Sequence, residues 1–179
     1  TNKKIIEALN ETNKWWKGKL ILDYRPREIY GNIKKFIPTK QILAFTGLRR
    51  VGKTTLMLKV VEEKLNSGFN PENIVYFSFD DFRDTKIKEI IDAYIVFMDK
   101  DKDDGKYLFL FDEIQKVVGW EEQIKRIYDL HSNFKIIVSG SESLFIRKGS
   151  RESLAGRFFE FKVHTLNFRE FLAFKGITI

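Results

Sequence analysis

Cysteine is absent from this chain, and several other residues are scarce. The 179 residues include no Cys, two His, three Pro and 11 Gly. A zinc site or a Cys–His nucleophile therefore has too few candidate residues, and the low Pro and Gly content argues against a low-complexity chain. No apolar run approaches the ~20 residues that a membrane span needs, and the amino end has no signal-peptide pattern. We expect a cytoplasmic protein with no membrane partner.

Apolar residues are plentiful, and the charge is positive. Hydrophobic residues make up 43% of the chain, with 17 Phe and 3 Trp, which is enough for one domain core and a small appendage. The net charge of +7 attracts phosphates, either of nucleotides or of nucleic acid. Because the lysines are spread along the chain, they favour a solvated surface over a dedicated DNA face, and DNA binding stays open.

Strand and helix patterns alternate through most of the sequence. Apolar runs predict strands at residues 41–46, 73–79, 106–111, 134–138 and 158–163. Helical spacing predicts helices at residues 53–65, 86–98 and 121–130. This alternation implies βαβ units and a parallel sheet of about five strands with helices on both faces. The predicted fold is α/β, a three-layer sandwich.

These patterns divide the chain into three predicted regions. Residues 1–40 are expected to form a helical segment packed on the core, with one helix near Ile5 and Leu9 and a second at residues 28–36. Residues 19–23 fit a short strand or an extended link. Residues 41–165 are the expected core, and 166–179 the start of a helical extension. Because the chain begins with Thr and stops soon after a predicted helix, we expect it to be part of a longer protein.

A phosphate-binding loop lies between the first predicted strand and the helix after it. It reads Gly47-Leu48-Arg49-Arg50-Val51-Gly52-Lys53-Thr54, a full match to the Walker A pattern. The glycines let the backbone approach a phosphate with its N–H groups inward, and the helix terminus adds partial positive charge. Lys53 is expected to reach the β- and γ-phosphates, and the Thr54 hydroxyl to bind Mg²⁺. The predicted ATP-binding residues are those of this loop and Thr55.

An acidic pair ends the third predicted strand. The run Tyr107-Leu108-Phe109-Leu110-Phe111-Asp112-Glu113 is the Walker B pattern, and a buried strand would carry its acids to the ligand-binding edge of the sheet. Asp112 is expected to hold Mg²⁺, directly or through water. Glu113 is expected to act as the general base on a water that attacks the γ-phosphate.

Two serines follow the fourth predicted strand. Ser139 is our first candidate for a residue that touches the γ-phosphate or the attacking water, and Ser141 is the second. The alternative is that both form a turn and cap the next helix.

Other charged residues have less defined roles. Arg157 or Arg151 could stabilise transition-state charge, in its own subunit or from a neighbour, or could be a surface arginine. Asp80 and Asp81 end the second predicted strand, where they could join a Mg²⁺–water network or cap the following segment.

These motifs occur together in a known group of proteins. With Gly119-Trp120-Glu121, Leu154-Ala155-Gly156-Arg157-Phe158 and Leu166-Asn167-Phe168-Arg169-Glu170-Phe171, the chain from about Arg25 onward resembles the AAA-like P-loop ATPases widespread in archaea and also found in bacteria. The resemblance implies a sheet of the ASCE class, with the Walker B strand beside the P-loop strand although it does not follow it in sequence. Such proteins usually continue into a winged-helix region, and some into a nuclease-like domain.

The sequence therefore predicts Mg²⁺-dependent ATP hydrolysis by the motor or switch module of a larger protein. DNA association and an oligomer stay open. One alternative is a small-molecule phosphotransferase, although no acceptor pocket or Arg-rich lid is evident and the Asp-Glu pair favours water as acceptor. The other alternative is a nucleotide-gated binding module with negligible turnover.

Overall fold

A five-stranded parallel sheet forms the centre of the molecule. The computed structural model describes residues 2–145 and 154–177. The strands are β1 (Ile42–Thr46), β2 (Ile74–Ser78), β3 (Tyr107–Asp112), β4 (Phe134–Gly140) and β5 (Phe158–Lys162). Their order in the sheet is β2-β3-β4-β1-β5, and all neighbouring strands are parallel. The prediction of an α/β fold with a parallel five-stranded sheet is confirmed.

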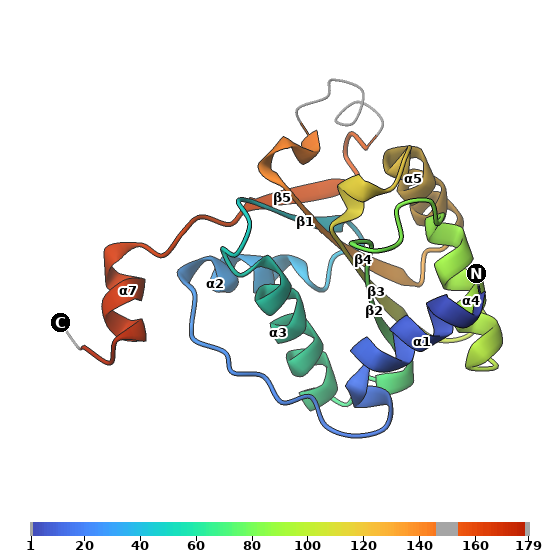
Figure 1. Cartoon of the computed structure of the whole chain (residues 1–179), viewed down its shortest axis with the longest axis horizontal. Coiled ribbons are helices and arrows are strands. Elements are labelled where there is room, and N and C mark those ends of the chain that lie inside the picture. The colour runs from blue at the N-terminus through green and yellow to red at the C-terminus, as the bar shows by residue number, and fades with distance from the viewer. Residues whose placement is uncertain (1, 146–153, 178–179) are drawn as a thin grey trace.

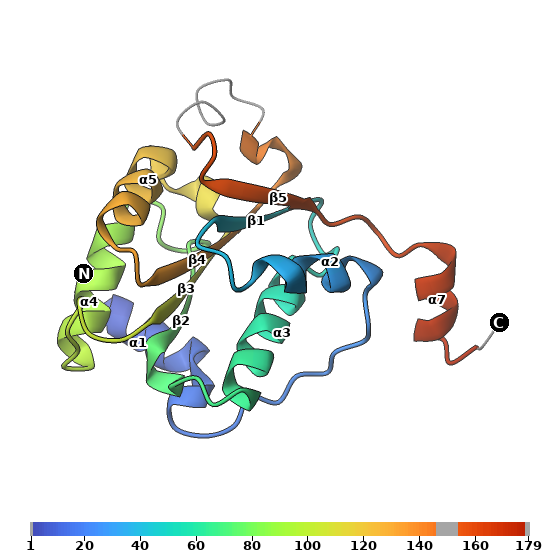
Figure 2. The ribbon, with the colours of Figure 1, turned by 180° about the vertical axis from the view of Figure 1, so that it is seen from behind.

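Helices cover both faces of this sheet (Figures 1 and 2). One face carries α2 (Glu28–Phe36) and α3 (Lys53–Asn66), and the other carries α1 (Asn2–Thr12), α4 (Ile87–Phe97) and α5 (Trp120–Leu130). Alternate residues of β3 serve the two layers: Phe109 packs toward α4 and α5, whereas Leu108 and Leu110 pack toward α2 and α3. Two-sided burial explains why the strands are continuous apolar runs.

The predicted bounds of the helices and strands in the core agree closely with those in the structure. Each strand and helix predicted between residues 41 and 163 is present, with ends that differ by at most two residues. The short 3₁₀ helices are η1 (Lys14–Trp16), η2 (Pro71–Asn73), η3 (Ile114–Lys116) and η4 (Glu142–Phe145). Residues 19–23 form no strand and are an extended link.

One expectation about the sheet was wrong. The P-loop strand β1 and the Walker B strand β3 are not neighbours, because β4 lies between them and pairs with both. The strand that ends in Ser139 and Gly140 thus lies between the phosphate-binding loop and the acidic pair. All three strand ends meet at the carboxyl edge of the sheet, where open α/β sheets bind ligands.

The N-terminal segment covers the outer edge of β2. The Asn13 side chain pairs with both backbone groups of Tyr76: its Nδ2 donates to the carbonyl at 2.9 Å, and its Oδ1 accepts from the N–H at 2.7 Å. The indole N–H groups of Trp15 and Trp16 both donate to the Ile74 carbonyl, at 3.1 and 2.9 Å. These contacts occupy backbone groups that an edge strand otherwise exposes to other chains.

The last helix, α7 (Phe168–Phe174), lies apart from the sheet (Figures 1 and 2). A capping box fixes its start, since the Asn167 side chain accepts from the Glu170 N–H and the Glu170 carboxylate accepts from the Asn167 N–H. Glu170 is also linked to the start of α2, because it accepts from the Glu28 N–H at 2.9 Å. This helix is therefore connected to the core mainly through polar contacts.

Candidate nucleotide-binding site

The Walker A sequence forms a tight loop between β1 and α3. Gly47 has φ 153°, and a Cβ there would lie 2.3 Å from the carbonyl oxygen of Val163, the residue directly after β5. Gly52 has φ 99°, a conformation that glycine adopts without strain. Arg50 has φ 63°, which is unusual for a residue with a side chain. The loop thus packs closely against the end of β5, and its backbone conformation allows α3 to begin at Lys53.

Lys53 is folded into the curve of this loop. Its side chain is buried, and its Nζ donates to the carbonyls of Gly47 at 2.9 Å and Leu48 at 2.7 Å. A lysine ammonium has three donors, so one more can serve an anion held by the loop.

The predicted magnesium ligands are brought together. Thr54 Oγ1 donates to Asp112 Oδ2 at 2.6 Å. The hydroxyl of Tyr76 donates to the same carboxylate oxygen at 2.7 Å, and the hydroxyl of Ser139 donates to Oδ1. Burial and then the Asp112 charge raise the pKa of Tyr76 well above its usual range, so this phenol keeps its proton and remains a donor. Tyr76 was not identified from the sequence as a residue of this site.

Glu113 follows in a strained backbone conformation. It has φ 55°, and its N–H donates to Asp112 Oδ1 at 3.1 Å and to Ser139 Oγ at 3.2 Å. Its carboxylate accepts from Gln115 Nε2 at 2.6 Å. Arg50 and Glu113 are two of the three non-glycine residues with positive φ in the described part of the chain. Strain of this kind is concentrated at functional sites.

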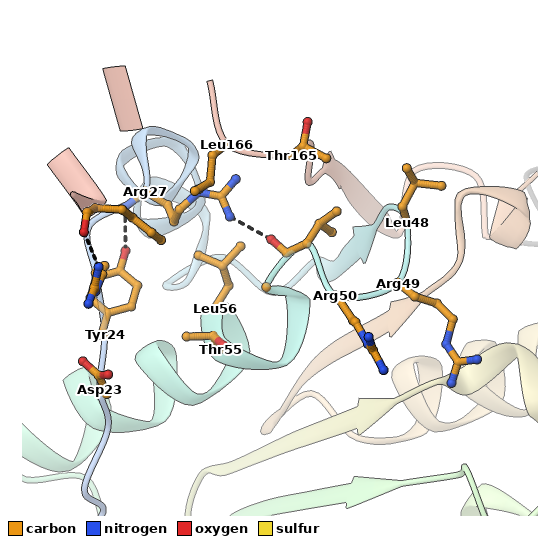
Figure 3. A pocket seen from close by; sticks show the side chains of 14 residues that line it. Asp23, Tyr24, Arg27, Leu48, Arg49, Arg50, Thr55, Leu56, Thr165 and Leu166 are labelled. Atoms are coloured by element: carbon orange, nitrogen blue, oxygen red, sulfur yellow. Dashed lines mark hydrogen bonds between the residues drawn. The ribbon is translucent and has the colours of Figure 1, made fainter. Parts of the chain in front are cut away.

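A pocket of about 610 Å³ opens beside the loop (Figure 3). Its walls come from the P-loop, the start of α3, the link before α2, the segment before α7 and the end of α7. The lining residues include Tyr24, Arg27, Thr55, Leu56, Thr165, Leu166 and Phe174. Arg49 and Arg50 also line it, and Figure 3 shows both side chains on the side away from Tyr24 and Arg27. Neither guanidinium has a partner among residues 2–145 and 154–177.

Arg27 connects the walls of this pocket, and it too was missed from the sequence. Its guanidinium donates to the Val51 carbonyl at 2.7 Å, the His164 carbonyl at 2.8 Å and Glu170 Oε1 at 3.0 Å. The side chains of Arg27 and Glu170 are only 9% and 7% exposed. Burial alone would raise the pKa of Glu170, but donors from Glu28, Arg27 and Asn167 hold it below its usual value. One arginine thus joins the P-loop, the end of β5 and α7.

Arg157 is not near this site. It directly precedes β5, and its carbonyl accepts from the N–H of Ile42, the first residue of β1. It therefore lies at the amino edge of the sheet, opposite the P-loop, and its guanidinium makes two hydrogen bonds to Asp129 at 2.9 and 3.2 Å. This position contradicts a role for Arg157 on the nucleotide of its own chain. Arg151 lies outside the described residues.

The remaining candidates take different positions. The hydroxyls of Ser141 and Ser143 are 2.8 Å apart, so Ser141 belongs to the turn after β4. Asp80 pairs with Lys116 at 3.3 Å, and Asp81 is exposed. Ser139, in contrast, is fully buried and bonded to Asp112, which gives it a position between the Walker B acids and the P-loop strand.

This combination of a parallel sheet, a glycine-bounded loop and an acidic strand end defines a P-loop nucleotide-binding domain of the ATPase type. A family model described as an AAA domain matches residues 39–172. The chain belongs to this family.

Curated relatives share its sequence at moderate identity. An uncharacterized protein of Haemophilus influenzae is 31% identical over 144 residues, covering 80% of this chain and 36% of the relative. An uncharacterized protein of Methanocaldococcus jannaschii is 33% identical over 147 residues, covering 81% and 31%. The chain thus spans about a third of the length of these relatives.

Solved structures share its fold. A Walker-type ATPase of Pyrococcus abyssi has a TM-score of 0.56 at 16% identity, covering 92% of this chain and 63% of the other. The Hsp104–ADP complex of Saccharomyces cerevisiae has a TM-score of 0.59 at 16% identity, covering 96% and 26%. Among the described helices of this chain, none has the length and apolar character needed to cross a membrane.

Proposed function

We propose that this domain binds ATP with Mg²⁺ and hydrolyses the β–γ phosphoanhydride, as the motor or switch module of a longer protein. The observation that carries the proposal is the contact between Thr54, at the end of the Walker A loop, and Asp112, which precedes Glu113. The two motifs meet in the 2.6 Å hydrogen bond from Thr54 to Asp112, two residues that lie 58 positions apart.

The loop and the adjoining pocket fit a nucleoside triphosphate. Because Gly47 has no side chain, the loop sits close against β5, with its N–H groups available for phosphate oxygens. Lys53 and the N-terminus of α3 supply positive charge at the same place. The pocket of about 610 Å³, with Tyr24, Leu56 and Leu166 in its walls, has the size and mixed polarity suited to an adenosine group.

The donor set near the loop fits Mg²⁺. This ion prefers oxygen ligands and, at nucleotide sites, uses one or two protein groups together with substrate phosphates and water. Thr54 and Asp112 offer a hydroxyl and a carboxylate that already touch. Within the described ranges no cluster of three or more acidic or histidine side chains could hold a metal, which agrees with a shared protein–phosphate site. When bound, the ion would neutralise charge on the phosphates.

Water is the acceptor that the site favours. Glu113 follows the metal-binding position directly, and its carboxylate can take a proton from a water that attacks the γ-phosphorus. The new P–O bond forms as the bond to the β–γ bridging oxygen breaks, and ADP and inorganic phosphate are the products. Arg49 and Arg50 belong to the loop itself and line the pocket, so their guanidinium groups could stabilise charge on the phosphates.

Two further parts of the proposal concern the whole protein. If Arg157 serves catalysis, a neighbouring subunit must deliver it, and its bonds to Asp129 must then break. A role for DNA rests only on the net charge of +7, so the longer protein has to be tested for salt-dependent binding to duplex DNA with and without ATP.

The direct test compares three forms of the intact protein. Calorimetry with Mg²⁺ and ATP should show binding by the wild type and by Glu113→Gln, but not by Lys53→Ala. Phosphate release should be full only with the wild type, reduced to residual turnover in Glu113→Gln and absent in Lys53→Ala. Tight binding without phosphate release by the wild type would instead identify a nucleotide-gated binding module, and acceptor-dependent loss of ATP would identify a phosphotransferase.

A further inference from the structure

Among the described residues, the side chain that donates a hydrogen bond to the carboxylate of Glu113 is that of Gln115. Its Nε2 donates to Glu113 Oε2 at 2.6 Å. The direction of this bond is fixed by chemistry, because a carboxylate only accepts and would repel the amide oxygen if the amide were turned around. Glu113 is thus held by a neutral donor two residues further along the chain.

The backbone around Gln115 is fixed by a 3₁₀ turn and by packing of the neighbouring Ile114 in the core. It is the middle residue of η3, which is closed by the bond from the Val117 N–H to the Ile114 carbonyl at 3.0 Å. Ile114 is fully buried in the core between the sheet and α4 and α5. The turn cannot shift without disturbing this packing, so the amide is presented to Glu113 at a fixed place.

The other end of the amide is held by packing. Gln115 Oε1 is buried and has no hydrogen-bond partner in the described part of the chain. It lies against Gly140 at the end of β4, where an added Cβ would come within 2.7 Å of it. A buried acceptor without a partner is unfavourable, and such exceptions call for an explanation beyond folding. Gly140 provides the space that lets the amide point its N–H group at Glu113.

We propose that Gln115 is a positioning residue for ATP hydrolysis: its amide orients the Glu113 carboxylate so that the free oxygen, Oε1, faces the attacking water. A general base is commonly oriented by a third group in this way. A carboxylate has two oxygens, so one can be held by Gln115 while the other accepts the proton from water. The inference rests on the proposed ATPase function and assigns to that site a residue outside the Walker motifs.

The first test is Gln115→Met, which keeps the length of the side chain but removes the donor. In the intact protein with Mg²⁺ and ATP, kcat should fall roughly 10- to 100-fold, as expected when a catalytic group is displaced by about 1 Å. ATP affinity measured by calorimetry should stay unchanged, since the hydrogen bond of the Gln115 side chain goes to Glu113 and not to the phosphate-binding loop. An unchanged or increased kcat in Gln115→Met overturns the inference.

A double-mutant cycle shows whether Gln115 acts through Glu113. In a Glu113→Gln background, which retains only residual turnover, adding Gln115→Met should cause no further loss. A second loss as large as the first would mean that Gln115 stabilises the fold or acts separately, and the inference would then be wrong. If the wild type itself releases no phosphate, the proposed function fails, and this inference fails with it.

Gly140→Ala tests the same idea from another strand. Its new Cβ would displace the ends of two flexible side chains, Gln115 and Leu144, so folding should be retained while the amide moves. We expect a loss of kcat like that of Gln115→Met, with the same ATP affinity. Gly31→Ala on α2 is the matched control, since a Cβ there meets nothing within 4 Å. Full activity in a folded Gly140→Ala protein contradicts the packing role.

Discussion

The hydroxyl of Thr54 donates a hydrogen bond of 2.6 Å to the carboxylate of Asp112, although 58 residues separate them. Thr54 is the second residue of α3, and Asp112 is the last of β3. Their contact joins the loop that would hold the phosphates to the strand that would supply an acidic metal ligand. It also provides two adjacent oxygen ligands for a single ion.

Asp112→Asn should abolish Mg²⁺-dependent turnover while leaving the fold intact. The amide can still pair with Thr54 and Ser139, but it lacks the negative charge that binds a hard cation. We expect phosphate release to fall by at least ~100-fold, because the loss of metal-assisted charge stabilisation amounts to several kcal/mol. Phosphate release measured over a Mg²⁺ titration checks this, and normal magnesium dependence in the variant would contradict the assignment.

Tyr76→Phe should weaken magnesium binding without removing it. The Tyr76 hydroxyl orients the Asp112 carboxylate through a 2.7 Å hydrogen bond to Oδ2. Loss of such an outer partner typically costs ~10- to 100-fold in metal affinity. The midpoint of a Mg²⁺ titration of ATP hydrolysis should therefore rise. Tyr94→Phe is the matched control, because its hydroxyl donates to the Glu72 carbonyl, away from the site. Equal midpoints in both variants would refute the role of Tyr76.

Much of this site could be predicted from local sequence motifs. The rest could not, because it depends on the register between strands and on contacts between distant segments. The loop from Gly47 to Thr54 could be recognised because each position has its own chemical requirement. Tyr76 could not, because it reaches Asp112 only when β2 and β3 pair with Ser78 opposite Asp112, a register that two apolar runs leave undetermined. Arg27 had no signal either, since its partners come from distant segments.

For Arg157, the sequence itself could have excluded one of the alternatives, a role on the nucleotide of its own chain. A residue that precedes a parallel strand lies at the amino edge of the sheet, whereas ligand-binding residues follow the strands. Residues 158–163 were predicted to form a strand, so Arg157 had to lie opposite the P-loop. The position of β4 between β1 and β3 could not be predicted in the same way. Strand order depends on how the helices pack across the sheet, and no single segment of the sequence determines it.

Asn13→Ala should destabilise the protein by exposing the edge of β2. The substitution leaves the Tyr76 N–H without its Asn13 partner and leaves the Tyr76 carbonyl with only the longer bond of 3.5 Å from Thr12 Oγ1. A buried polar group that loses its partner costs about 1–3 kcal/mol where water cannot reach it. Chemical denaturation should show a lower midpoint with an unchanged slope. Asn10→Ala, which removes only a bond within α1, should have a smaller effect. Equal midpoints for the two variants would show that the edge contact is unimportant.

Arg27→Met should weaken both the fold and ATP binding, because one guanidinium holds the P-loop and α7 together. Removing one partner of a buried ion pair typically costs about 3–5 kcal/mol, and Glu170 would remain buried without its cation. We expect a lower melting temperature and a smaller increase of that temperature on adding Mg²⁺ and ATP than in the wild type.

Glu170→Gln separates the two effects of Arg27. It removes the charge that faces Arg27 but leaves the bond from Arg27 to the Val51 carbonyl, so the melting temperature should fall while ATP affinity changes little. The pH dependence follows from the pKa of Glu170, which lies below its usual 4.5 in the folded protein. Its contribution is present above about pH 4.5 and is lost as the pH falls through the folded-state pKa. Wild type and Glu170→Gln should therefore converge in stability under acid conditions; a constant difference down to low pH would show that the charge of Glu170 does not stabilise the position of α7.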